Sequence, residues 1–148
     1  MNRQNCATHA LKASFVNLDT SLMIDPVLYL NEVYLAQNRM LRELGRDFSE
    51  LSSYVENLKE NEWMVAFFGP FSSSKFYDPD DYSESYLYYP DEQYHFILRE
   101  KDGTWTQMDY NSAFATVANI QEEVKCFEEK GYKPYFFAVS YIRSDSAG

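Results

Sequence analysis

The sequence has few of the features that mark secreted disulfide-rich, signal-bearing or membrane-spanning proteins. Only two of its 148 residues are cysteines, Cys6 and Cys126, which is too few for a disulfide framework. We therefore expect two free thiols in a reducing compartment. No apolar run of about 18 residues is present, so we expect no membrane-spanning helix. Because the N-terminus lacks a basic region followed by an apolar stretch, we expect a cytoplasmic protein or one exported without a signal peptide.

Basic residues are also scarce. The chain has 13 Lys and Arg against 23 Asp and Glu, a formal net charge of −10 and a pI near 4.6. Such a surface repels phosphate backbones, so a nucleic-acid partner is disfavoured. Hydrophobic residues make up 45% of the chain and aromatic residues 18%, enough to form a real core. The length predicts one domain spanning residues 1–148. The sequence has no internal repeats.

The pattern of apolar residues predicts an α+β fold. Helices are expected over 5–14, 26–44, 47–58 and 113–130, and strands over 63–68, 96–98, 104–108 and 135–142. The run at 63–68 is continuously apolar and ends at Gly69-Pro70, which is typical of a central strand buried on both faces. We therefore expect a mostly antiparallel sheet of about four strands, with the N-terminal helices packed on one side.

Residues 94–110 are predicted to form a β-hairpin, because Asp102-Gly103 is a strong turn signal between two β-prone runs. If these two residues form the tip, the numbers of paired residues add up to about 205. His95 then lies near Asp109, Tyr110 and Asn111. A carboxylate or amide at this position can hold an imidazole in one tautomer and orientation.

Cys6 falls in the first turn of the first predicted helix, for which Asn5 is the expected N-cap. A lone cysteine on a helix is commonly a small buried hydrophobe. Alternatively, the unpaired N–H groups and positive dipole end of a helix N-terminus favour a nucleophilic thiolate. In that case the Cys6 N–H and the Gln4 side chain are candidate oxyanion donors. We expect His9 to have a structural role or to lie on the surface. Cys126 is expected to be an unreactive cysteine that serves only packing.

Residues 70–93 separate the central strand from the hairpin. The part from Tyr77 onward is acidic and rich in tyrosine, and long loops in compact domains often bind ligands. We expect a substrate-facing rim that includes Tyr86, Tyr89 and Tyr94, because tyrosine supplies contact area at low entropic cost. The aspartates here lack the glycine and distal glutamate of an EF-hand loop, so no metal site and no cofactor are predicted.

Two motifs resemble those of papain-like and NlpC/P60-like cysteine peptidases, including small bacterial and phage-associated proteins and effector or toxin domains. Asn5-Cys6-Ala7-Thr8-His9-Ala10-Leu11 is similar to their nucleophile motif. Tyr94-His95-Phe96 followed by Asp102-Gly103-Thr104-Trp105-Thr106 is similar to their histidine hairpin. The resemblance implies a papain-like fold in which Cys6 is the nucleophile and His95 the general base.

The identity of a third catalytic residue stays open. Related hairpins often continue Trp-Ser-His-Lys-Pro-Gly, whereas this chain has Trp105-Thr106-Gln107-Met108-Asp109-Tyr110. Asp109 is the stronger acceptor for a histidine N–H, and Asn111 imitates the orienting amide of papain-type sites; both remain candidates for the residue that holds His95.

The resulting hypothesis is a thiol hydrolase that cleaves an amide bond in a protein or peptide. Cys6 attacks the carbonyl, and His95 takes and returns the proton. The same residues can run deamidation or acyl transfer, since the acceptor depends on the shape of the pocket. The alternative is a non-catalytic interaction module that binds through residues 77–94. The sequence indicates no oligomeric state.

Overall fold

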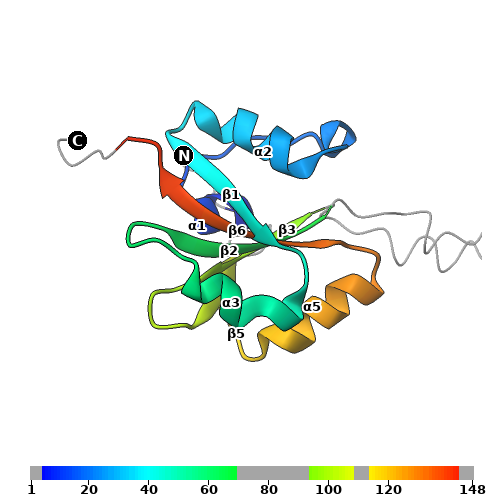
Figure 1. Ribbon diagram of the computed structural model, residues 1–148. Coiled ribbons are helices and arrows are strands. Elements are labelled where there is room, and N and C mark those ends of the chain that lie inside the picture. The colour runs from blue at the N-terminus through cyan, green and yellow to red at the C-terminus, as the bar shows by residue number, and fades with distance from the viewer. Residues whose placement is uncertain (1–4, 70–93, 109–113, 144–148) are drawn as a thin grey trace, which may run out of the picture.

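The computed structural model describes residues 5–69, 94–108 and 114–143 (Figure 1). Within them, six strands form one antiparallel sheet in the order β1-β6-β2-β3-β4-β5. The strands are β1 (Arg39–Gly45), β2 (Trp63–Phe68), β3 (His95–Arg99), β4 (Trp105–Met108), β5 (Phe114–Val117) and β6 (Pro134–Tyr141). The α-helices are α1 (Cys6–Leu11), α2 (Pro26–Leu35), α3 (Leu51–Glu56) and α5 (Ile120–Glu129), and two 3₁₀ turns are η1 (Thr20–Leu22) and η2 (Phe48–Glu50).

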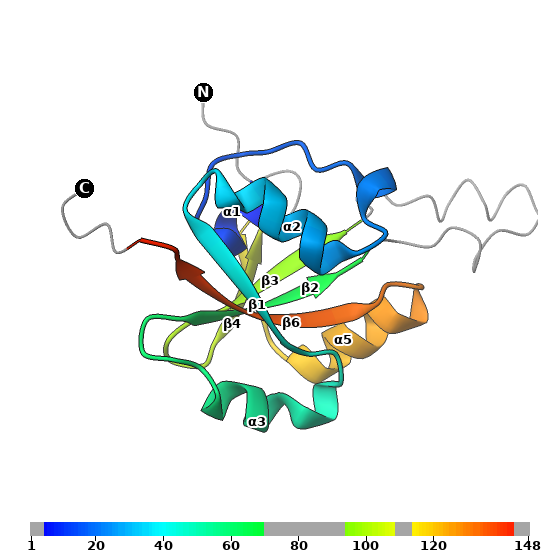
Figure 2. The same cartoon turned by 45° about the horizontal axis from the view of Figure 1, so that its top comes forward.

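The predicted α+β class and the antiparallel sheet are confirmed, but helices cover both faces of the sheet. Figures 1 and 2 show α1 and α2 on one face, and α3 and α5 on the other. We name these the α1/α2 face and the α3/α5 face. The described residues contain six strands instead of the expected four or so. No helix in the described part of the chain is both long and apolar enough to cross a bilayer.

Each face of the sheet has its own apolar core, because successive side chains of a strand point to opposite faces. In β2, Val65 and Phe67 pack on the α1/α2 face, whereas Ala66 and Phe68 pack on the α3/α5 face. The prediction that this strand is buried on both faces is therefore confirmed. The sheet separates the two cores, so a side chain on one face does not meet a side chain on the other.

Two strands occupy segments that the sequence pattern assigned to helices. The helix expected over 26–44 ends at Leu35, because Asn38 turns the chain at φ 64° and β1 then pairs with β6. The helix expected over 113–130 begins only at Ile120, where the side chain of the N-cap Asn119 accepts a hydrogen bond from the Glu122 N–H. The preceding residues form β5. In both cases pairing at an edge of the sheet overrides helical periodicity.

The predicted hairpin is present, with a register one residue away from the expected one. Leu98 pairs with Thr106 and Arg99 with Trp105, so the residue numbers of each pair add up to 204. The loop accordingly contains three residues and ends at Gly103, whose φ of 90° is a conformation that glycine adopts readily. Moving the register by one residue changes which side chains of the partner strand share a face with His95.

The outer edge of β1 is closed by a side chain of α2. Asn31 accepts a hydrogen bond from the Leu41 N–H at 2.9 Å and donates one to the Leu41 carbonyl at 2.9 Å. The amide therefore takes the place of a neighbouring strand at this residue. Unpaired edges of sheets are templates for pairing with another chain, so the contact protects β1 against edge-to-edge association.

We expect Asn31→Leu to lower the free energy of unfolding by about 1–2 kcal/mol, because the Asn31 side chain loses its two hydrogen bonds to the Leu41 backbone and a third to the Val27 carbonyl. The variant should also self-associate as its concentration rises, which size-exclusion chromatography with light scattering measures. Gln37→Leu is the matched control, since Gln37 bonds both backbone groups of Ser14 in the same way but away from a strand edge. An Asn31→Leu variant that stays as monodisperse as Gln37→Leu would contradict the protective role.

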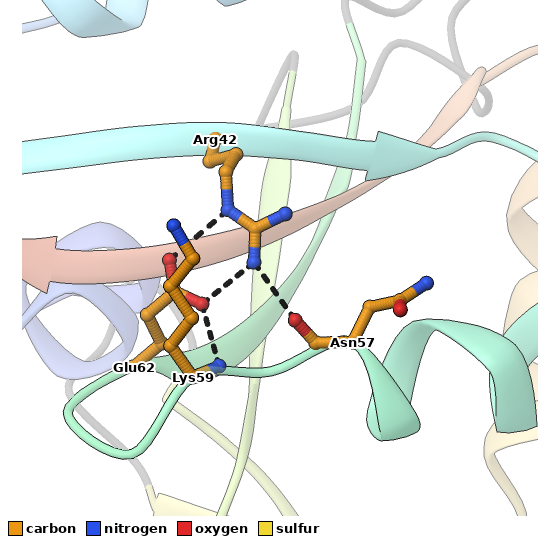
Figure 3. Close-up of polar contacts among 4 residues, drawn as sticks. All are labelled: Arg42, Asn57, Lys59 and Glu62. Atoms are coloured by element: carbon orange, nitrogen blue, oxygen red, sulfur yellow. Dashed lines mark hydrogen bonds and ion pairs between the residues drawn. The ribbon is translucent and has the colours of Figure 1, made fainter.

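A second polar contact ties β1 to the segment before β2. The Arg42 guanidinium donates to both carboxylate oxygens of Glu62, Nη2 to Oε1 at 2.6 Å and Nε to Oε2 at 3.1 Å, and also to the Asn57 carbonyl (Figure 3). The Lys59 N–H donates to the same carboxylate. These hydrogen bonds, above all that from Arg42, lower the pKa of Glu62. The cluster is a satisfied structural network rather than a binding site.

Candidate functional site

The helix that carries Cys6 is fixed at both ends. At its start, Asn5 accepts a hydrogen bond from the Thr8 N–H, and Thr8 Oγ1 accepts one from the Asn5 N–H, so the predicted N-cap is confirmed as half of a capping box. Near its end, Trp63 Nε1 donates to the Ala10 carbonyl at 2.9 Å, and Arg39 Nε donates to the Leu11 carbonyl at 2.9 Å. These hydrogen bonds tie the end of α1 to β1 and β2, while the helix itself packs on β3 and β4.

Cys6 is buried in the core of the α1/α2 face, with an exposed fraction of 1%. Tyr34 of α2 and Tyr94 lie on the same side of the sheet. Burial raises the pKa of Tyr34, and Tyr94 and Cys6 raise it further. Tyr94 also contacts the rings of Phe67 and Phe96. The thiol is thus packed among large side chains, as expected for a cysteine that acts as a small hydrophobe.

The His95 ring lies on the α3/α5 face. Its Nε2 atom is 2.7 Å from Gln107 Oε1, and its ring stacks on Phe127 of α5, with centroids 5.2 Å apart and planes inclined by 19°. Phe127 in turn stacks on Phe68, a core residue of this face. Only 7% of His95 is exposed. The ring is therefore held by a neutral amide and by an aromatic side chain.

The described arrangement does not bring Cys6 and His95 together. Cys6 belongs to the same core as Phe96, and alternation along β3 sends His95 to the opposite face of the strand. General-base catalysis needs the base within hydrogen-bonding reach of the thiol. The predicted Cys6–His95 pair is not formed, because α1 packs on the face of β3 that His95 does not share.

Most of the remaining predicted site residues lie outside the described residues. These are Gln4, Tyr86, Tyr89, Asp109 and Asn111. Gln107, which the structure brings to His95, was not among the predicted site residues. A signal for it was available, since Gln107 follows Trp105-Thr106 at the position where the hairpins that the sequence resembles have the histidine of Trp-Ser-His.

The second histidine takes part in a chain of hydrogen bonds across the α1/α2 face. Thr106 Oγ1 donates to Glu100 Oε2 at 2.8 Å, and His9 Nε2 lies 2.9 Å from the same hydroxyl. Because the single hydroxyl proton goes to Glu100, His9 Nε2 donates to Thr106. Burial lowers the pKa of His9, Glu100 opposes this effect, and Lys12 adds to it. The predicted structural role of His9 agrees with these contacts.

Stability should therefore fall when His9 is forced to take up a proton. The pKa of His9 in the folded state lies below its value in the unfolded chain, so the folded state binds fewer protons. The contribution of neutral His9 to the free energy of unfolding is therefore complete above about pH 6.5 and is lost as the pH falls below it. Urea unfolding at several pH values from about 7.5 to 5 measures it. His9→Gln keeps a donor for Thr106 and should show a shallower loss. A steeper loss in the variant would mean that Glu100 outweighs burial.

Within the described residues, four of the exposed large apolar side chains lie on α2 and the turn before it. We call this set the α2 surface, and its members have exposed fractions of 59% for Leu22, 95% for Ile24, 58% for Leu28 and 63% for Leu35. Leu28 and Leu35 are seven residues apart, so they share one face of the helix. Single exposed hydrophobes are common, but a group on one element is typical of a contact surface.

The comparisons with known proteins place the chain in no family. No protein-family model matches it, and no curated protein matches it. Its class therefore rests on the fold alone: an α+β protein with helices on both faces of an antiparallel sheet.

Proposed function

We propose that the chain is a protein-binding module and that the α2 surface is its binding site. The observation that supports the proposal is the grouping of four exposed large apolar side chains on one outer helix and its preceding turn. In Figure 1 this helix lies at the periphery of the molecule, away from the sheet edge formed by β5. Burying such side chains against a partner is the usual source of binding energy in protein complexes.

The state of the two predicted catalytic residues favours binding over catalysis. Cys6 is packed in the core of one face and His95 is bonded to Gln107 on the other. Neither group is left with the solvent access and mutual contact that a nucleophile and its base require. The segment 77–93, expected as an alternative binding surface, lies outside the described residues, so the proposal relies on α2.

Cross-linking in cells that express the chain tests the proposal. The double variant Leu28→Ser/Leu35→Ser should lose the cross-linked partner, whereas Cys6→Ala and His95→Phe should keep it. Phe114→Ser is the matched control, because Phe114 is 59% exposed on β5, on another element. Partner capture that survives the double variant, or that disappears with Phe114→Ser as well, would count against α2 as the site.

A second candidate is the thiol hydrolase that the resemblance implies. The hydrogen bond between His95 and Gln107 favours it, since a catalytic imidazole needs an orienting partner, and α1 packs on the strand that begins with His95. In this proposal Cys6 attacks an amide carbonyl of a protein or peptide, and His95 transfers the proton. The competent state must place both groups on one side of β3. Loss of amide-bond cleavage in Cys6→Ala, with partner binding unchanged, would favour this candidate.

A further inference from the structure

The α2 surface has the spacing of a helix-binding site. Leu28 and Leu35 lie about 10.5 Å apart along the axis, the rise of seven helical residues. Ile24, which is 95% exposed, lies just before the N-cap Asp25. An amphipathic helix presents apolar side chains at this same interval of seven residues. Two such stripes can therefore align over the length of α2.

The charged residues of the chain segment that carries this surface have one sign. Residues 13–38 contain no lysine, arginine or histidine, and their acidic residues Asp19, Asp25 and Glu32 are all exposed. Glu32 lies between Leu28 and Leu35 on the helix. Asp25 also acts electrostatically on Arg46, whose guanidinium is paired with Glu43, Nε to Oε1 at 2.6 Å. Carboxylates thus lie within the apolar stripe and before its start, where they attract cations and repel anions.

We propose that the occupant of the α2 surface is an amphipathic helix of a partner protein, with an apolar stripe flanked by lysine and arginine. This inference rests on the proposed binding function and names the class of partner. A second copy of the chain fits less well, because two-fold pairing sets Glu32 and Asp25 against the same carboxylates. The chain's own segment 70–93 has the wrong charge as well, with one lysine, Lys75, against six acidic residues: Asp78, Asp80, Asp81, Glu84, Asp91 and Glu92.

Fluorescence anisotropy with three synthetic peptides on the full chain tests the inference. Each peptide has about 18 residues, or five helical turns. The first has leucines on one helical face and lysines elsewhere, the second has the same composition in scrambled order, and the third has glutamates in place of the lysines. We expect the first to bind most tightly and Leu28→Ser/Leu35→Ser to weaken it about tenfold or more. Glu32→Lys should weaken the first peptide and strengthen the third.

The possible outcomes separate the inference from the function on which it rests. If the leucine–lysine and leucine–glutamate peptides bind equally and both lose affinity in the double variant, α2 is a binding site but the basic partner is wrong. If the scrambled peptide binds as well as the ordered one, or if the double variant changes nothing, both proposals fail. Self-association of the wild type that disappears in the double variant would replace the partner helix by a second copy.

Discussion

Iodoacetamide at neutral pH should modify Cys126 at least about a hundredfold faster than Cys6. Cys126, which was predicted to serve packing, is instead exposed on α5, whereas Cys6 is 1% exposed in the core of the α1/α2 face. A buried thiol reacts only after local opening, and a hundredfold protection corresponds to an opening free energy of about 2.7 kcal/mol. Mass spectrometry of tryptic peptides over time gives both rates in one experiment.

The control for this result is the same reaction in denaturant, where both thiols should react at similar rates. The single-thiol variants Cys6→Ala and Cys126→Ser assign each rate without overlap. A Cys6 that reacts faster than Cys126 in the native protein would mean an accessible, activated thiolate. That result would reverse our preference and make the thiol hydrolase the better proposal.

The hairpin shows how far sequence reasoning reached. Asp102-Gly103 correctly placed the turn, because few residues other than glycine adopt the φ of 90° found at Gly103. The register was one residue off, since a three-residue loop and a two-residue loop share the same turn signal. That single residue decides that Gln107 lies beside the imidazole of His95.

The face on which α1 packs was beyond sequence reasoning. Small residues such as Ala7 and Ala10 predict that the helix packs closely against a sheet, and both are fully buried. The sequence of α1 itself does not indicate which face of β3 the helix packs on. Long-range contacts decide this, among them the hydrogen bonds from Arg39 and Trp63 to the last turn of the helix. The Cys6–His95 hypothesis depended on that choice.

The edge strand β1 was not predicted for a related reason. Met40 and Leu41 extend the helical pattern of α2, yet they lie in β1, where Leu41 packs in the core and Met40 is 47% exposed. Periodicity does not reveal the free edge of β6 that β1 covers. Asn31, which looks like an ordinary polar position of a helix, has its role only because β1 exists.

The hydrogen bond between His95 and Gln107 should give a measurable coupling energy in a double-mutant cycle. Gln107→Leu removes the acceptor facing a ring that is 7% exposed, so we expect a loss of about 1–3 kcal/mol in the free energy of unfolding. His95→Phe keeps an aromatic ring against Phe127 and should cost less. The double variant should be more stable than the sum of the two losses predicts, by about 0.5–3 kcal/mol. Urea unfolding of the four proteins measures this cycle.

A distant pair of residues supplies the control. Gln37 bonds to Ser14 and not to His95, so the losses in the free energy of unfolding caused by His95→Phe and Gln37→Leu should simply add up in the double variant. A coupling near zero in the His95–Gln107 cycle would mean that the hydrogen bond does not stabilise the fold. Gln107→Leu that keeps full stability but abolishes an amide-cleaving activity would assign Gln107 to orienting a catalytic base. Loss of stability with partner binding retained fits the arrangement described, in which His95 joins β3 to β4 through Gln107 and joins the hairpin to α5 through Phe127.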